Sequence, residues 1–445
     1  MSLSTIPHEL RLAIVRRLRL SLGADKEACR SQGRDLALVS SQWRTLGTML
    51  SWEKFDLHFD GNELIAGEMR HVYEHLHLAN YLLNISIDIV LPEESDLWVK
   101  QGMFPNIRNR METERFATSV LPRCSGLRYL NMTFNTLDNA QLFLMPFCNK
   151  RHNPFPRLRT FTFIYDDTMH EGETQTLDYS VSLPCTALLE ALPLFSSLEK
   201  LDLRLRSGSD ADLPYDDLPS SPALPNLEHL RIDFAAFVSK NFNFTGDTEP
   251  TYLESEDYLL YVLSLPSPTR LRSLVLSVSI LTSSTISTLQ SFTSLTSLEL
   301  RLEPKTLLGI LDSIPSLLNS LNRLTNLGLF ATHTIKRGKL INPSRPQLES
   351  LLSSLPTSLV TLTTYFDLSD NFQSVIDQFL NSRLGGSLKS WQYWDRRMQE
   401  EKLQGRRADN WELVLTETYK TSEGGELSWK KRARHFRFLK DLKHR

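Results

Sequence analysis

A short apolar pattern, LxxLxL with other apolar residues substituting, recurs along most of the 445-residue chain. The alternation within each copy predicts a short strand with one buried face. Such strands bury their leucines only beside similar neighbours, so stacked copies predict a parallel sheet. Nine copies begin at Leu127, Leu158, Leu198, Leu227, Leu271, Leu295, Leu324, Leu359 and Leu388, and two weaker copies begin at Trp52 and Leu82.

The segments between copies contain helical patterns, such as "TALLEALPLFSSLEKLDL", in which Pro193 predicts a helix end before the next copy. From Leu127 onward the copies are 24 to 44 residues apart, mostly at or above the 20–29 residues of a leucine-rich repeat. The chain therefore resembles leucine-rich-repeat proteins. The resemblance implies an α/β fold with a horseshoe solenoid over residues 59–395. The asparagine typical of this family after the strand occurs once, as Asn135, so we expect differently satisfied turns and irregular curvature.

The segment "STIPHELRLAIVRRL" has a different pattern. Pro7 suits the first turn of a helix, and Glu9 suits the positive end of the helix dipole. Leu10, Ile14 and Leu18 recur every four residues, with arginines elsewhere on the helical wheel. The pattern predicts an amphipathic helix whose apolar face is buried against something.

The motif "IPHEL", the apolar residues that follow it and the later motif "VSSQWR" together resemble the F-box, and "WEKFDL" matches the strand that often follows it. The resemblance implies a small all-α F-box-like domain over residues 1–58 that docks on the Skp adaptor of a cullin-RING ubiquitin ligase. The stretch "SLGADKEACRSQG" is longer than the usual link, so we expect an extended helix or a loop there. The residues implied to bind the adaptor are Ile6, Pro7, Leu10, Ile14, Leu18, Leu36, Val39 and Trp43.

Two functions are consistent with these motifs. In the first, the chain is a non-catalytic substrate-recognition subunit of the ligase, and the repeats bind a protein substrate. In the second, the N-terminal helices only cap the open core of the repeats, and the chain is a protein-interaction scaffold not engaged in ubiquitin transfer. Adaptor binding separates the two hypotheses.

The residues between the leucines of each copy point to the face of the sheet opposite the core. The middle copies carry mixed charges there, and the last copies carry aromatic residues. Arginine and aromatic side chains are frequent anchors of interfaces, although mixed charges also simply solvate an exposed sheet. The candidate substrate-binding residues are Arg204, Arg231, Arg301, Phe330, Tyr365 and Trp394.

Three insertions, "YDDTMHEGETQTLDYS", "SGSDADLPYDDLPSSPALP" and "SKNFNFTGDTEPTYLESED", hold fourteen acidic residues and one lysine. They form either an acidic rim that steers a basic substrate or ordinary solvated loops. In the region 396–445, "WELVLTETYKTSEGGELSWK" predicts a hairpin with its turn near Gly424. The following "WKKRARHFRFLKDLKHR" predicts a capping helix with a basic outer face, or alternatively a nuclear-localisation or anion-binding patch.

Composition excludes several classes. The net charge of −2 gives no bias toward nucleic acid or membranes, and no apolar run is long enough to span a bilayer. We expect a cytoplasmic or nuclear protein whose cysteines, Cys29, Cys124, Cys148 and Cys185, are reduced thiols. Catalytic motifs are lacking, and "HVYEHLH", with His71, His75 and His77, is more typical of a surface helix than of a metal site. We therefore expect no catalytic residue, cofactor or metal.

Overall fold

The computed structural model forms two compact units, residues 1–213 and 214–445. The division falls inside the predicted repeat region, and the boundaries expected at residues 58 and 395 stay predictions. The residues described are 6–22, 26–59, 71–90, 113–135, 137–144, 147, 153, 155–166, 188–189, 191–206, 223–234, 253–278, 281–331, 343–368, 372–382, 387–394, 410–419 and 428–437.

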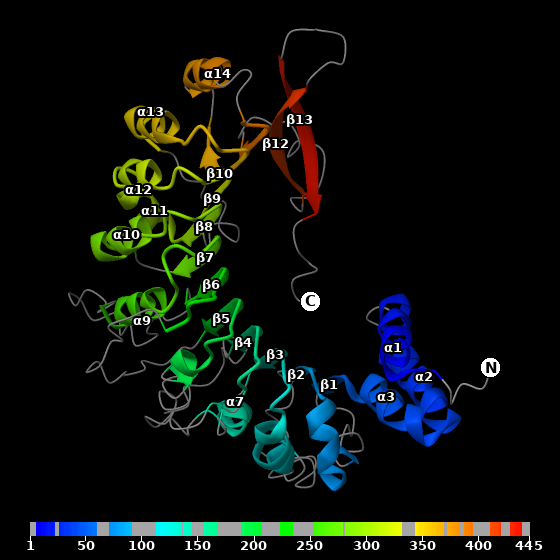
Figure 1. The fold of residues 1–445 in the computed structure, drawn as a ribbon. Helices are drawn as coiled ribbons and strands as arrows, with labels where there is room; N and C mark the ends of the chain where they lie inside the picture. The colour runs from blue at the N-terminus through cyan, green and yellow to red at the C-terminus, as the bar shows by residue number, and fades with distance from the viewer. Residues whose placement is uncertain are drawn as a thin grey trace. The chain divides into compact units, whose positions relative to one another are not determined.

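Unit 1 begins with three helices and continues as a parallel sheet (Figure 1). The helices are α1 (His8–Leu22), α2 (Lys26–Val39) and α3 (Ser41–Trp52). The strands, each parallel to its neighbour in sequence, are β1 (Lys54–Phe59), β2 (Asn84–Ile89), β3 (Tyr129–Phe134), β4 (Thr160–Asp166) and β5 (Lys200–Arg206). The elements between them are η2 (Leu76–Tyr81), η4 (Phe116–Val120), η5 (Leu121–Arg123), α7 (Leu137–Leu144) and η8 (Leu192–Leu194).

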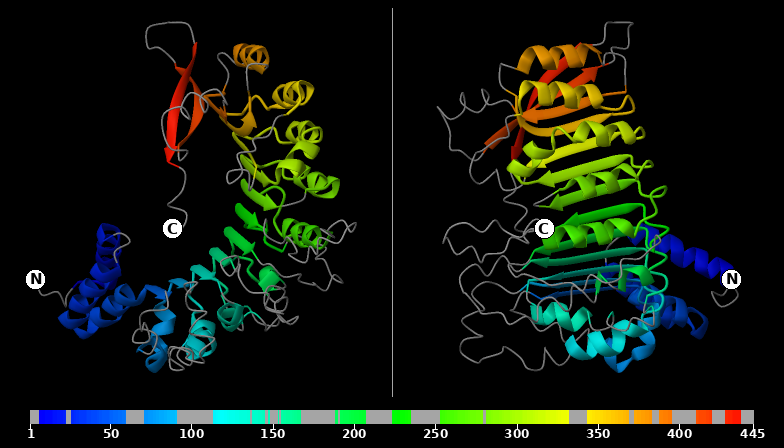
Figure 2. Two further views of the ribbon diagram at one scale, coloured as in Figure 1. Left: turned by 180° about the vertical axis from the view of Figure 1, so that it is seen from behind. Right: turned by 90° about the vertical axis from the view of Figure 1, so that its left-hand side faces the viewer.

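Unit 2 contains six parallel strands, with helices stacked along one side of the sheet in the same order as the strands (Figure 2). The strands are β6 (His229–Asp233), β7 (Ser273–Val278), β8 (Ser297–Leu302), β9 (Asn326–Ala331), β10 (Thr361–Asp367) and β11 (Ser390–Trp394). The helices are α9 (Leu253–Ser264), α10 (Ser283–Gln290), α11 (Pro304–Ile310), α12 (Ile314–Ser320), α13 (Arg345–Ser354) and α14 (Gln373–Ser382).

The strand prediction is confirmed for all eleven copies. Each of β1–β11 begins two residues after the first apolar residue of its copy, as β3 begins at Tyr129 after Leu127. Alternate residues are buried, as Leu130 and Met132 are in β3, so one face of each sheet forms a core. In unit 1, phenylalanines join the leucines in the core between β3 and β5, whereas leucine dominates the core of unit 2.

Backbone and hydroxyl hydrogen bonds join successive copies just before their strands. The residue just before one strand accepts two amide hydrogen bonds from the next copy, as Arg272 O does from the amides of Thr296 and Ser297. The side chain of Thr296 adds a third bond to Arg272 O at 3.0 Å, and Thr325 Oγ1 donates in the same way to Thr296 O at 2.9 Å. These bonds link successive copies at the start of their strands, and the expectation for the turns after the strands stays a prediction.

The prediction of a leucine-rich-repeat horseshoe is wrong. The structure has an α/β architecture in which β1–β11 run parallel to their neighbours within each unit, but it consists of two compact units. The apolar pattern specifies strand burial and pairing, and it leaves the opposite layer unspecified. That layer consists largely of short 3₁₀ and π turns in unit 1, and of helices of seven to twelve residues in unit 2. Over the described residues, this layer therefore does not repeat one constant unit.

The N-terminal helices are not an F-box, which corrects the second part of the fold prediction. A helix does occupy the long link, because α2 already begins at Lys26. The backbone then breaks at Ser40, which is extended at φ −168° and ψ 168°. Val39 therefore ends α2 while Trp43 lies in the first turn of α3, so these two residues of the "VSSQWR" motif belong to different helices.

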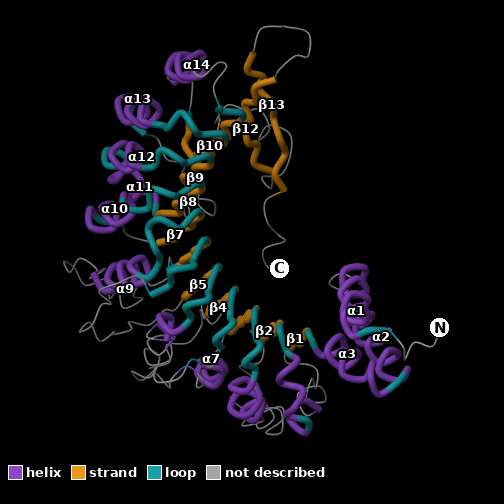
Figure 3. Tube along the Cα trace, in the orientation of Figure 1, coloured by secondary structure: helices purple, strands orange, loops and turns teal. Residues whose placement is uncertain are grey.

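The C-terminal helix prediction is also wrong over the described residues. Residues 428–437 form β13 (Ser428–Arg437), which pairs antiparallel with β12 (Asn410–Tyr419) along its whole length (Figure 3). β12 in turn pairs antiparallel with β11. This pairing satisfies the backbone groups on the edge of β13 that faces β12. The hairpin is confirmed by its register, whereas Gly424 and the residues after 437 lie outside the described residues.

Candidate functional site: the N-terminal helices and the polar strand face

Helices α2 and α3 cross at two glycines. A Cβ atom on Gly33 would lie 2.6 Å from Gly47 O and 2.2 Å from Ser51 Oγ. A Cβ atom on Gly47 would lie 2.3 Å from Gly33 O and 2.6 Å from the amide nitrogen of Ala37. The backbones of α2 and α3 therefore approach more closely than any other residue type allows. This contact fixes how the two helices present their outer surfaces.

The core of the three helices comes mainly from α3. Trp43, Leu46 and Leu50 lie one helical turn apart and are 2–3% exposed. At the end of α3, Trp52 stacks on His71 with ring centroids 5.1 Å apart, and the Arg30 guanidinium lies 5.2 Å from the Trp52 ring centroid. The helices are thus tied to the segment after β1 by aromatic contacts.

Large apolar side chains remain exposed on each of the three helices. We define the helical apolar surface as Leu10 and Ile14 of α1 together with Leu38 and Val39 of α2. Their exposed fractions are 57%, 39%, 84% and 44%, and Met49 of α3 is 38% exposed. Among the described residues, Tyr129 on β3 is the one other large apolar or aromatic residue with such exposure. Several exposed apolar side chains on one small helical segment are typical of an interaction site.

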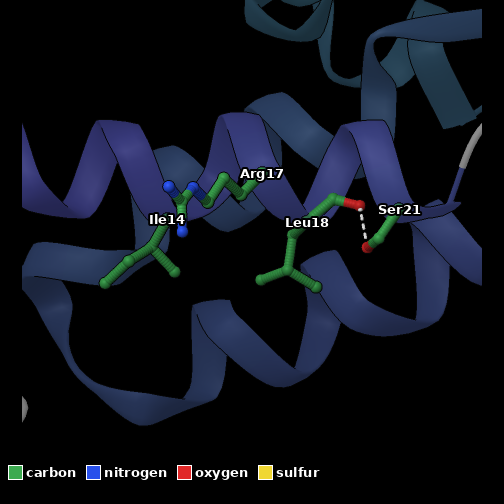
Figure 4. A pocket seen from close by; sticks show the side chains of 4 residues that line it. All are labelled: Ile14, Arg17, Leu18 and Ser21. Atoms are coloured by element: carbon green, nitrogen blue, oxygen red, sulfur yellow. Dashed lines mark hydrogen bonds between the residues drawn. The ribbon is translucent and has the colours of Figure 1, made fainter.

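An open pocket of about 640 Å³ lies along α1 and is lined by Ile14, Arg17, Leu18 and Ser21. Figure 4 shows Ile14 and Leu18 pointing to the same side of the helix, while the Arg17 side chain runs along the helix toward Ile14. The Ser21 hydroxyl donates to Leu18 O at 2.7 Å, so it is engaged by its own helix. The pocket therefore offers two aliphatic walls and a guanidinium at its rim.

The structure places the eight predicted adaptor-binding residues at three depths. Pro7, Leu10, Ile14 and Val39 are exposed, whereas Ile6, Leu18 and Leu36 are half-buried. Trp43 is buried in the core, where it supports the helices. The sequence reasoning missed Leu38 and Arg17. Leu38 lies beside the predicted Val39. Its place at the end of α2, just before the backbone break at Ser40, is the sequence feature that could have indicated it.

Arginines on the polar strand face form ion pairs with carboxylates of their own strand. In unit 1, Arg204 of β5 donates from Nε and Nη2 to the two carboxylate oxygens of Asp202, at 3.0 and 2.7 Å. In unit 2, Arg301 Nε of β8 lies 2.5 Å from Glu299 Oε1. These pairs match the hypothesis that mixed charges solvate the sheet, and a substrate would have to compete with them.

The structure brings together two of the predicted substrate residues. Arg301 of β8 lies opposite Phe330 of β9 in the strand register. The Arg301 guanidinium lies 5.7 Å from the Phe330 ring centroid. The ring occupies the space over Gly328, where a Cβ atom would lie 2.5 Å from Phe330 Cε2 and 3.2 Å from Glu299 Cγ. A flat aromatic ring with an arginine beside it thus lies on the sheet of unit 2.

The other candidates are not gathered around this ring by any described contact. Arg204 belongs to unit 1, and Arg231 is a half-buried residue of β6 in unit 2. Tyr365 and Trp394 lie in β10 and β11, and their side chains are outside the described part of the structure. The acidic insertions fall almost entirely on residues 167–187, 207–222 and 235–252, which are also outside the described residues.

The histidine cluster forms a ring stack. His71 and His75 stack with centroids 4.5 Å apart, His77 meets His75 edge-on at 6.1 Å, and His75 Nδ1 is bonded to His71 O at 3.0 Å. Burial and the nearby His75 lower the pKa of His71. Within the described ranges, no group of three or more His, Cys, Asp or Glu side chains is arranged to hold a metal ion.

Two further observations concern cysteines and membranes. Cys29 and Cys124 are buried reduced thiols, and burial raises the pKa of the Cys124 thiol to about 12. Cys148 and Cys185 lie outside the described residues.

Where the structure is described, the helices are too short or too polar to cross a membrane.

Comparison with models of known protein families and with curated proteins gave no match to this chain.

Proposed function

We propose that the chain is a non-catalytic substrate-recognition subunit of a cullin-RING ubiquitin ligase, with its N-terminal helices docking on the Skp adaptor. The observation that carries the proposal is the exposure of Leu10 and Ile14, two large apolar side chains of α1 that remain available for contact with a partner. The proposal concerns the partner of these helices and needs neither an F-box fold nor a horseshoe.

Energetic reasoning supports a partner for these side chains. Fully burying a leucine or isoleucine side chain stabilises a protein or complex by about 1.5–3 kcal/mol. Leu38, at 84% exposure, keeps almost all of that free energy available for association. The rigid crossing of α2 and α3 at Gly33 and Gly47 orders the surface before binding, which reduces the entropy lost on docking.

In this proposal the strand faces hold a protein substrate and position it near the active site of another subunit, so the chain itself needs no catalytic group. Arg301 and Phe330 are the best-defined candidates for substrate contact, since they form one ordered cluster. The proposal leaves the substrate unidentified.

Co-purification tests the proposal. The full chain and the variant Leu10→Asp plus Ile14→Asp are each expressed with the Skp adaptor, and circular dichroism verifies that both are folded. We expect the adaptor to co-purify with the wild type and to be lost from the double variant. A folded wild type that fails to bind would leave the alternative, an interaction scaffold outside ubiquitin transfer.

A further inference from the structure

We infer that the pocket on α1 receives an aliphatic side chain flanked by carboxylates, so the docking partner presents an acidic amphipathic surface. The inference rests on the proposed function and specifies the chemistry of the same site. It starts from charge: α1 carries four arginines and one glutamate, and α1–α3 together hold eight basic and three acidic residues.

The charge of these helices is local. Their net charge is +5, whereas the whole chain has a net charge of −2. The net charge of the whole chain therefore does not reveal that the helices with exposed apolar residues are basic. A partner that docks here must bury apolar surface and place negative charge beside the arginines, because like charges across an interface oppose association.

The geometry of the pocket makes this requirement specific. Ile14 and Leu18 point to the same side and offer apolar walls (Figure 4). Arg17 lines the same pocket from an exposed position on α1. A guanidinium next to an apolar depression favours a partner that presents an aliphatic side chain to the depression and a carboxylate beside it. Arginine binds carboxylates through two parallel hydrogen bonds.

The hydroxyl of Ser21 does not compete for this role, because it donates to Leu18 O within its own helix. Among the four lining residues, Arg17 therefore supplies the polar recognition, and the two aliphatic residues supply the apolar contact. Electrostatic attraction of this kind raises the association rate and weakens as salt screens the charges.

The test measures the affinity of the full chain for purified Skp adaptor at low and high salt, where the screening length falls from about 10 Å at 0.1 M to about 3 Å at 1 M. Arg17→Glu is compared with Arg17→Lys, which keeps the charge, and with Arg157→Glu. The last variant makes the same charge change at an exposed arginine in the turn before β4.

We expect Arg17→Glu to weaken binding about tenfold at low salt and much less at high salt, because the reversal replaces attraction with repulsion. Arg17→Lys keeps the charge but loses the two parallel hydrogen bonds, so it should weaken binding less than Arg17→Glu does. Arg157→Glu should bind nearly as the wild type does. Binding that is insensitive to salt, or an equal effect of Arg17→Glu and Arg157→Glu, would overturn the acidic-partner inference while leaving the proposed function intact. A folded wild type that binds at neither salt concentration would overturn both.

Discussion

Gly33 of α2 and Gly47 of α3 lie in backbone contact, such that a methyl group on either residue would overlap the main chain of the other helix. Neither helix can move aside without disturbing the core residues Trp43, Leu46 and Leu50. The orientation of the helical apolar surface therefore depends on the absence of two side chains.

Substitution of alanine for Gly33 or Gly47 is expected to destabilise unit 1 by about 1–3 kcal/mol, the usual cost of overpacking, despite the better helix propensity of alanine. Gly309→Ala is the matched control, since nothing lies within 4 Å of the position of its Cβ. It should leave stability unchanged or slightly higher in urea unfolding followed by circular dichroism. A neutral Gly47→Ala would contradict the close crossing.

The contact between Gly328 and Phe330 predicts a strong dependence of one substitution on another. Gly328→Ala should displace the Phe330 ring and lower stability, whereas the same substitution in a Phe330→Ala background should have much less effect. A double-mutant cycle from urea unfolding measures this coupling. Additive effects of the two substitutions would show that the ring does not lie over Gly328.

Protonation of His71 is expected to weaken the contact of the N-terminal helices with residues 71–75. Desolvation and His75 lower the pKa of His71 below 6.5, Arg34 and Arg30 act in the same direction, and Glu74 opposes them. Because the pKa is lower in the folded state, the stabilising contribution is present above pH 6.5. It is lost as the pH falls through the folded-state pKa.

The melting temperature of the wild type should therefore decrease more than that of His71→Phe when the pH is lowered from 7.5 to 5.5. These two values lie about one unit either side of the ordinary histidine pKa. Phenylalanine can stack on Trp52 without gaining charge. His58→Gln in β1 is a matched control, because it removes a different histidine, one whose Nδ1 lies 3.0 Å from Asp88 Oδ2. An equal pH dependence of the wild type and His71→Phe would contradict the assignment.

Hydroxyl groups before the strands should contribute measurably to the stability of unit 2. Ser358 Oγ lies 2.8 Å from both Asn322 O and Leu324 O, so its single hydroxyl proton is shared between these carbonyls and joins two successive copies. Ser358→Ala should cost about 1 kcal/mol, the usual net value of a hydrogen bond. Ser353→Ala, which removes a bond within the exposed face of α13, should cost less in the same unfolding experiment.

Cys124 should resist alkylation in the folded protein. Burial raises the pKa of its thiol to about 12, so almost no reactive thiolate exists at pH 8. Mass spectrometry after iodoacetamide treatment should find Cys124 labelled only when the protein is unfolded in urea. Labelling of the native protein at the rate of an exposed thiol would contradict this expectation.

The strands were predictable from sequence because alternation has a direct physical consequence. Leu130, Met132 and Phe134 share one buried face because the backbone between them is extended, and the same alternation located each of β1–β11. The layer that covers the apolar face of the strands is less constrained by the sequence. 3₁₀ turns, π turns and helices can all cover such a face. A horseshoe was therefore more than the pattern could establish.

The N-terminal site was only partly predictable. The four-residue spacing of Leu10 and Ile14 correctly located α1, because it depends on one helix alone. The break at Ser40 and the crossing at Gly33 and Gly47 depend on contacts between helices, which periodicity does not encode. Residues 428–437 show the same limit, since pairing with β12 outweighed a helical spacing of apolar residues.

The most direct test of the central claim is hydrogen–deuterium exchange of the full chain with and without the Skp adaptor. The account predicts that the adaptor protects peptides from α1 and from the end of α2 around Leu38. Peptides from β6–β11 should exchange as before. Unchanged exchange in α1 and α2 at saturating adaptor, or protection confined to the strands, would contradict docking through the helical apolar surface.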